Sequence, residues 1–199
     1  MAEQYSIQAE TLMKAAVEEY KEILLEIDAS DANESVLKGI RINIQGKPRR
    51  LVDVGDLKKT EDKNKLQILV FNTDHIELIT EKIDEIDFNY EIDGQFINID
   101  VPDPSYKQLM EVVDNINRKK NSSMSRLTKA KSEATTRART AVENEFITQG
   151  VATAASRKCD AFYEEHSGEI EELTTEKIKQ ILGTEFFEKY KTEEIDPFQ

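Results

Sequence analysis

Cysteine, glycine and proline are scarce in this sequence, and each scarcity excludes a class of protein. Cys159 is the only cysteine among 199 residues, so no internal disulfide can form, which suits a reducing compartment. Seven glycines and four prolines are few for an all-β protein and are typical of a chain rich in long helices. No apolar run approaches the roughly 18 residues that a membrane span requires, so no membrane partner is expected.

The sequence also lacks the motifs on which catalysis depends. His75 and His166 are the only histidines, they lie far apart, and no HExxH, CxxC, GxGxxG or P-loop pattern is present. His166 and Cys159 share an apolar helical stripe, which favours a structural histidine and a small buried cysteine over a ligand or a nucleophile. The acidic stretch 28–39 is not an EF-hand, because its sixth and twelfth positions are Asn and Gly rather than Gly and Glu. We expect neither an enzyme nor a protein with a metal or cofactor.

Positive charge is rare overall but concentrated in one segment. The formal net charge is −13, yet residues 107–139 hold nine Lys or Arg and three acids. A basic segment in an acidic chain is the feature to weigh for function, although charge runs are more often an ordinary solvated helix face.

Hydrophobic periodicity predicts three long helices with an α+β insert after the first. Residues 7–27, a stretch of some forty residues from Ser105 to Phe146, and a stripe from Ala155 to Ile181 repeat apolar side chains at helical spacing. Such helices are expected to pack side by side. Within the insert, at about 40–101, strands are expected at 40–44, 50–54, 66–71 and 96–101, a helix at 74–86, and a polar loop at 55–65.

Three stretches inside this order resemble the ribosome recycling factor family. They are LKGIRINIQGKP at 37–48, LQILVFN at 66–72 and INIDVPDPS at 97–105. Each is weak alone, but their order and spacing match the family with almost no gaps, along roughly residues 7–182.

The resemblance implies an α+β, L-shaped protein of two domains. Residues 1–29 and 105–185 would form a three-helix bundle, and 30–104 would form an inserted β/α/β domain. Hinge linkers would lie at 28–38 and 102–105, and 186–199 would be a C-terminal tail. The predicted hinge residues are Asp28, Ser30, Asp31, Asn33, Pro102 and Pro104.

The resemblance also implies a non-enzymatic function. The family binds the rRNA of the large ribosomal subunit after termination and, with elongation factor G, splits the post-termination complex. Contacts from Lys and Arg to phosphates would carry this binding. The RNA-binding candidates that the resemblance implies are Arg118, Lys119, Arg126, Lys129, Lys131, Arg137 and Arg139. A monomer is expected.

Two regions depart from the family pattern. Asp28 and Asp31 stand where the family linker carries arginines, and Ser132 and Glu133 replace two arginines of the long helix. These departures support an alternative, a paralogue with the same fold that does not recycle ribosomes and acts as a structural or assembly protein.

The N-terminus, MAEQYSIQAETLM, resembles neither a signal peptide nor an arginine-rich transit peptide. We therefore expect a cytoplasmic protein, with a mature chain of the mitochondrial matrix as the alternative.

Overall fold

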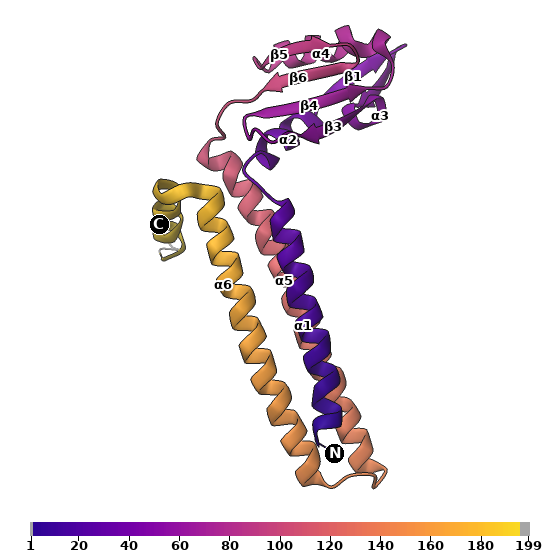
Figure 1. The fold of residues 1–199 in the computed structure, drawn as a ribbon, viewed down its shortest axis with the longest axis vertical. Coiled ribbons are helices and arrows are strands. Elements are labelled where there is room, and N and C mark those ends of the chain that lie inside the picture. Colours follow the sequence, from indigo (N-terminus) through magenta and orange to yellow (C-terminus); the bar gives the residue numbers. More distant parts are fainter. Residues whose placement is uncertain (1, 196–199) are drawn as a thin grey trace. The chain divides into compact units, whose positions relative to one another are not determined.

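The computed structural model describes residues 2–195 and divides the chain into two compact units, residues 1–27 with 113–199, and 28–112. The first unit, here called the bundle, contains three helices that run side by side (Figure 1). They are α1 (Ala2–Glu26), α5 (Tyr106–Glu143, whose first turns belong to the other unit) and α6 (Gln149–Ile195). The predicted helical bundle is confirmed.

The bundle interior consists of small apolar residues over much of its length. Ala130, Ala134 and Ala138 of α5 are buried at successive turns, because residues four apart lie on the same helix face. Larger side chains, including Met13 and Tyr20 of α1, fill the space that they leave. The Tyr20 hydroxyl forms a buried hydrogen bond with the Thr174 hydroxyl, which satisfies both polar groups inside the bundle.

One detail of the predicted helices is wrong. Phe146 was expected on the apolar stripe, but α5 ends at Glu143 and the Phe146 side chain is 76% exposed. Near the C-terminal end of α6, Gly183 has φ +71°, a backbone conformation that interrupts the helix and that glycine adopts readily. The predicted tail, 186–199, is helical as far as Ile195, and its last four residues lie outside the described part of the chain.

The second unit, here called the insert, combines two antiparallel sheets with short helices. Strands β1 (Arg41–Ile44) and β2 (Lys47–Arg50) form a hairpin, and a four-stranded sheet has the order β3-β4-β6-β5. Its strands are β3 (Gly55–Lys59), β4 (Lys65–Val70), β5 (Asn89–Asp93) and β6 (Phe96–Asp100). The helices are α2 (Asp31–Lys38), α3 (Leu51–Val54), the 3-10 turn Thr73–His75 and α4 (Ile76–Glu85).

One apolar core holds the insert together. Ile68 and Ile97, which are paired across β4 and β6, face Ile79 and Ile83 of α4, and all four are fully buried. Leu37 of α2 and Ile42 of β1 belong to the same cluster, so the helix and the hairpin are both attached to the sheet by burial.

The structure corrects three predictions for the insert. Residues 51–54 form a helical turn rather than a strand, and the Asp53 carboxylate accepts a hydrogen bond from the Arg50 backbone N–H at 3.1 Å. The predicted loop at 55–65 contains β3, since pairing with β4 overrides its polar composition. Strand β5 was missed because its residues, NYEID, are mostly polar and lie at the sheet edge.

None of the helices among residues 2–195 is both long enough and apolar enough to cross a membrane.

Candidate nucleic-acid interface

The seven predicted RNA-binding residues all lie on α5, but the helix distributes them around its circumference. A helix advances about 100° per residue, and the spacing of these cations is irregular, so their side chains point in several directions. The buried alanines fix which side of α5 faces α1 and α6. Some cations therefore lie beside neighbouring helices, and others point to solvent.

Three of the seven contact neighbouring helices within the bundle. Arg126 pairs with the Glu19 carboxylate of α1, and Arg137 donates a hydrogen bond to the side-chain oxygen of Gln8. Lys131 lies 3.0 Å from the carboxylate of Asp160 on α6, and its ammonium is 4.8 Å from the ring centroid of Tyr163. These cations link helices and are only partly available to an external phosphate.

The remaining four are directed outward. Arg118, Lys119 and Arg139 are exposed and form no salt bridge with any residue in the described range 2–195, and we call them the unpaired set. Lys129 lies 4.0 Å from Glu133 on its own helix, at the limit of an ion pair, and its side chain is 77% exposed. The structure therefore narrows the candidate RNA contacts of α5 to these four cations.

Sequence reasoning missed the hydroxyl groups that lie among these cations. Ser122, Ser125, Ser132 and Thr136 of α5 are all exposed. Hydroxyl groups donate hydrogen bonds to phosphate oxygens, so they complement the cations chemically. The signal in the sequence was the clustering of Ser and Thr on the side of the helix opposite its alanines.

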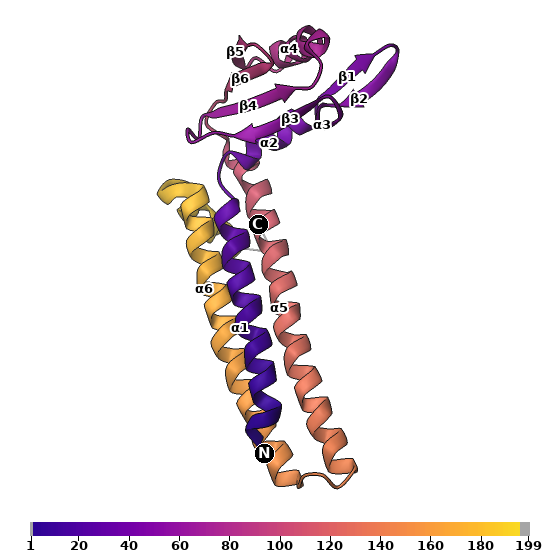
Figure 2. The ribbon, with the colours of Figure 1, turned by 45° about the vertical axis from the view of Figure 1, so that its right-hand side comes forward.

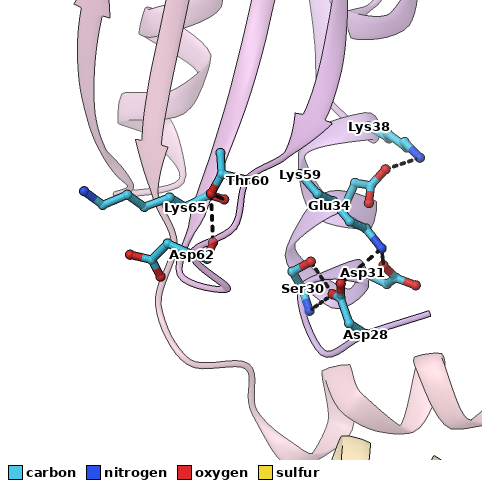
Figure 3. Close-up of polar contacts among 9 residues, drawn as sticks. All are labelled: Asp28, Ser30, Asp31, Glu34, Lys38, Lys59, Thr60, Asp62 and Lys65. Carbon is cyan, nitrogen blue, oxygen red and sulfur yellow. Dashed lines mark hydrogen bonds and ion pairs between the residues drawn. The ribbon is translucent and has the colours of Figure 1, made fainter. Parts of the chain in front are cut away.

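The predicted hinge residues lie mainly around α2. The Asp28 carboxylate accepts hydrogen bonds from the Ser30 backbone N–H, at 2.8 Å, and from the Ser30 hydroxyl (Figure 3). Such local bonds redirect the chain immediately before a helix. Asn33 is buried and its side-chain amide donates to the carbonyl oxygen of Pro102 at 3.0 Å, which joins α2 to the segment that follows β6. Pro104 is half-buried, and the hinge role of all six residues stays a prediction.

A lysine from the sheet occupies the space between the two aspartates. Lys59, at the end of β3, lies 3.5 Å from the Asp28 carboxylate and forms an ion pair with Asp31 (Figure 3). The ammonium group is thus the cation that these carboxylates share. Within the described residues, no group of three or more His, Cys, Asp or Glu side chains has the arrangement of a metal site.

This environment shifts the three ionisable groups in different directions. Burial alone would raise the pKa of Asp28, but hydrogen bonds from Ser30 and the charge of Lys59 outweigh it, so the pKa lies below its usual value. Burial raises the pKa of Asp31 despite its contact with Lys59. Burial would lower the pKa of Lys59, but Asp31 and Asp28 outweigh burial and raise it, so Lys59 is charged at neutral pH.

The two residues considered for chemistry are part of the bundle interior. Cys159 is 1% exposed and burial raises the pKa of its thiol, which disfavours the reactive thiolate. His166 is 5% exposed, and its Nδ1 lies 3.6 Å from the Glu169 carboxylate. Both side chains are buried, as their position on the apolar stripe predicted.

Comparison with protein families gives a match to one family model. The ribosome recycling factor model matches residues 20–182, which includes most of both units. The chain belongs to the ribosome recycling factor family. Comparison with curated protein sequences gives no match.

Two solved structures show the extent of the similarity. A solution structure of the ribosome recycling factor has a TM-score of 0.52 and 22% identity, covering 92% of this chain and 98% of that chain. A second match, in models of the T. thermophilus ribosome recycling factor and the E. coli elongation factor G bound to the E. coli post-termination complex, has a TM-score of 0.49 and 14% identity. This match covers 92% of this chain and 100% of that chain. The first match confirms that the fold, a helical bundle with an α/β insert, is that of ribosome recycling factor.

Proposed function

We propose that this protein acts in ribosome recycling by binding the rRNA of the large ribosomal subunit after termination. Together with elongation factor G it promotes splitting of the post-termination complex. Family membership supports the process, and the cations of α5 support the RNA contact. The protein works without a catalytic centre, in the cytoplasm or alternatively in the mitochondrial matrix.

The observation that carries the proposal is the unpaired set on α5. Arg118, Lys119 and Arg139 remain exposed and without a salt bridge among the described residues, in a chain whose net charge is −13. In such an acidic chain, carboxylates to pair with are abundant. Cations that nonetheless remain unpaired are available to neutralise phosphates, and each phosphate contact releases counterions.

Cosedimentation with ribosomes at low and raised salt tests this proposal. Replacing Arg118, Lys119 and Arg139 by Gln is expected to weaken binding by about tenfold or more at low salt and to flatten its salt dependence. The control replaces Arg157, Lys158 and Lys179 of α6 by Gln, which removes the same charge from the same unit. All three are exposed, and Lys158 lies 3.3 Å from the Glu3 carboxylate. Equal losses in both variants would show that net charge, rather than the α5 surface, governs binding.

A second candidate function is favoured by one specific observation. Asp28 and Asp31 are held in place by Lys59, so the region that carries arginines in the family here presents a group of two carboxylates and one ammonium. This arrangement supports a protein that keeps the fold but does not split ribosomes. A reconstituted splitting assay with elongation factor G separates the two functions, because full activity would exclude the second.

A further inference from the structure

The β1–β2 hairpin is the second concentration of positive charge in the molecule. Residues 38–50, KGIRINIQGKPRR, contain five Lys or Arg and no acid. This run lies outside α5 and belongs to the insert, so the contacts proposed for the bundle do not account for it.

The hairpin geometry displays these cations on both faces of a narrow ribbon. Gln45 and Gly46 form the turn with φ 51° and 76°, which tightens the connection to two residues. Arg41 is opposite Arg50, while Arg49 and Lys47 are opposite Ile42 and Ile44. Opposite residues share a face, so Arg41 and Arg50 lie on one face, and Lys47 and Arg49 lie on the other with Ile42 and Ile44. Positive charge therefore reaches both sides. In Figure 2 the hairpin extends beyond the four-stranded sheet of the insert.

Most of these cations form no salt bridge among residues 2–195. Arg50 is bound to Asp53 at 3.1 Å, and Lys38 is paired with Glu34 at 2.6 Å. Arg41, Lys47 and Arg49 are exposed and form no salt bridge with any other residue of the described chain. Three unpaired cations therefore lie within ten residues of a chain whose net charge is −13.

We propose that the β1–β2 hairpin is an RNA-binding element that contacts the phosphate backbone without reading base sequence. Arg and Lys on a projecting ribbon neutralise phosphates, and the exposed amide side chains of Asn43 and Gln45 add hydrogen-bonding groups. No exposed aromatic side chain lies between residues 41 and 50, so the hairpin offers no platform for base stacking.

An acidic protein is the less suitable partner for this surface. Protein interfaces depend on central apolar or aromatic anchors that enter a pocket on the partner. Ile42 is buried in the core of the insert and Ile44 is half-buried, so the exposed hairpin presents charge and amides around a single proline, Pro48. Phosphate recognition requires no apolar anchor and is the chemistry that fits.

Fluorescence anisotropy with the full-length protein and an RNA duplex of about 20 base pairs tests the proposal, since double-stranded RNA is recognised by its backbone over lengths of this order. The test variant carries Arg41→Gln, Lys47→Gln and Arg49→Gln. We expect its affinity at low salt to fall by about tenfold or more. The slope of log affinity against log salt is negative, and its magnitude should become smaller by about two. Two duplexes of unrelated sequence should give the same result.

The control carries Lys58→Gln, Lys63→Gln and Lys65→Gln, which removes the same charge from exposed positions of the same unit. Lys58 lies 3.6 Å from Asp56 and Lys65 lies 3.9 Å from Asp100, both at long ion-pair distances. A thermal melt of each variant establishes that both remain folded. A loss confined to the hairpin variant supports the proposal. Equal losses in both variants, or no loss in the hairpin variant, would overturn it. Polyglutamate serves as the acidic protein-like probe in the same assay. A hairpin variant that keeps RNA binding but loses binding to polyglutamate would also overturn the proposal.

This inference does not depend on the proposed recycling function. Repeating the titration in a protein that carries the α5 substitutions Arg118→Gln, Lys119→Gln and Arg139→Gln separates the two elements. The hairpin contribution should persist there as the same fold-change. A hairpin effect that exists only when α5 is intact would contradict an independent element.

Discussion

The bundle and the insert each contain paired and unpaired cations, but they form the pairs differently. In the bundle, Arg126 and Lys131 pair with carboxylates of neighbouring helices, because a long helix has neighbours on two sides. In the insert, Lys59 is held between two aspartates, whereas Arg41 and Arg49 on the hairpin remain unpaired. The difference shows that the position of a cation within its element, more than local net charge, determines whether it is available to a partner.

The largest effect is expected from loosening the hairpin that carries the unpaired cations of the insert. Ile42→Ala removes a side chain that is 1% exposed within the core, and the free energy of unfolding should fall by about 2–4 kcal/mol. Urea denaturation measures this loss. The control is Ile44→Ala, at a half-buried position of the same strand, which should cost clearly less. Equal costs would show that Ile42 does not attach the hairpin to the core.

The paired cation of the insert is expected to have the next largest effect. Lys59→Met leaves Asp28 and Asp31 without their shared partner, so the free energy of unfolding should fall by about 1–2 kcal/mol; partial exposure keeps the loss below that of a fully buried pair. Chemical denaturation at neutral pH checks this value. Lys58→Met, one residue earlier and mostly exposed, should have almost no effect. A similar loss in both variants would contradict the role of Lys59.

Neutralising the paired cations of the bundle should affect ribosome binding only slightly. Arg126→Gln combined with Lys131→Gln removes two charges of α5 that already contact Glu19 and Asp160. We expect less than about a threefold change in ribosome affinity, compared with tenfold or more for the unpaired set. Cosedimentation of the two variants side by side measures the ratio. A loss as large as that of the unpaired set would remove the distinction between paired and unpaired cations.

The smallest effects are expected from acid titration near α2, and they should have opposite signs. The pKa of Asp28 is lowered in the folded state, so its contribution to stability is present at neutral pH and lost as pH falls from about 3.8 through the lowered value. The pKa of Asp31 is raised, so the cost of its buried charge disappears as pH falls through that raised value.

The stability contributions of Asp28 and Asp31 are measured by denaturation across acidic pH. The proteins compared are the wild type, Asp28→Asn and Asp31→Asn. The stability of the wild type relative to Asp28→Asn should decrease on acidification, and that relative to Asp31→Asn should increase. Each change should stay below about 1 kcal/mol because both carboxylates are partly exposed. Changes of the same sign would mean that the two carboxylates titrate as one group with Lys59.

Local sequence patterns predicted the secondary structure correctly where the buried residues follow a regular period. The alternating Ile40, Ile42 and Ile44 predicted β1, and the apolar repeat of α5 predicted a helix of nearly its observed length. They failed where the composition of a segment disagrees with its contacts. Strand β3 has a polar sequence but pairs along its length with β4, and α3 replaced a predicted strand at residues 51–54. Strand pairing depends on backbone hydrogen bonds, which the hydrophobic pattern of the strand itself does not report.

The candidate site also has features that the sequence located and contacts that it did not indicate. The sequence located the basic segment of α5 and the acidic residues before α2, because charge and spacing are properties of the chain itself. It did not separate Arg126 from Arg118, and it did not indicate that Lys59 lies between Asp28 and Asp31. A salt bridge requires two side chains within a few ångströms, and α1 is separated from α5 by the whole insert.

The sequence by itself therefore determined the long helices and the insert between them, the family resemblance and the sign of each charged segment. The tertiary structure decided which of those charges face solvent. Burial and ion pairing both depend on which elements pack together, and packing joins residues as distant in sequence as Glu19 and Arg126. For this reason the unpaired cations of α5 and of the β1–β2 hairpin could be recognised only in the folded chain.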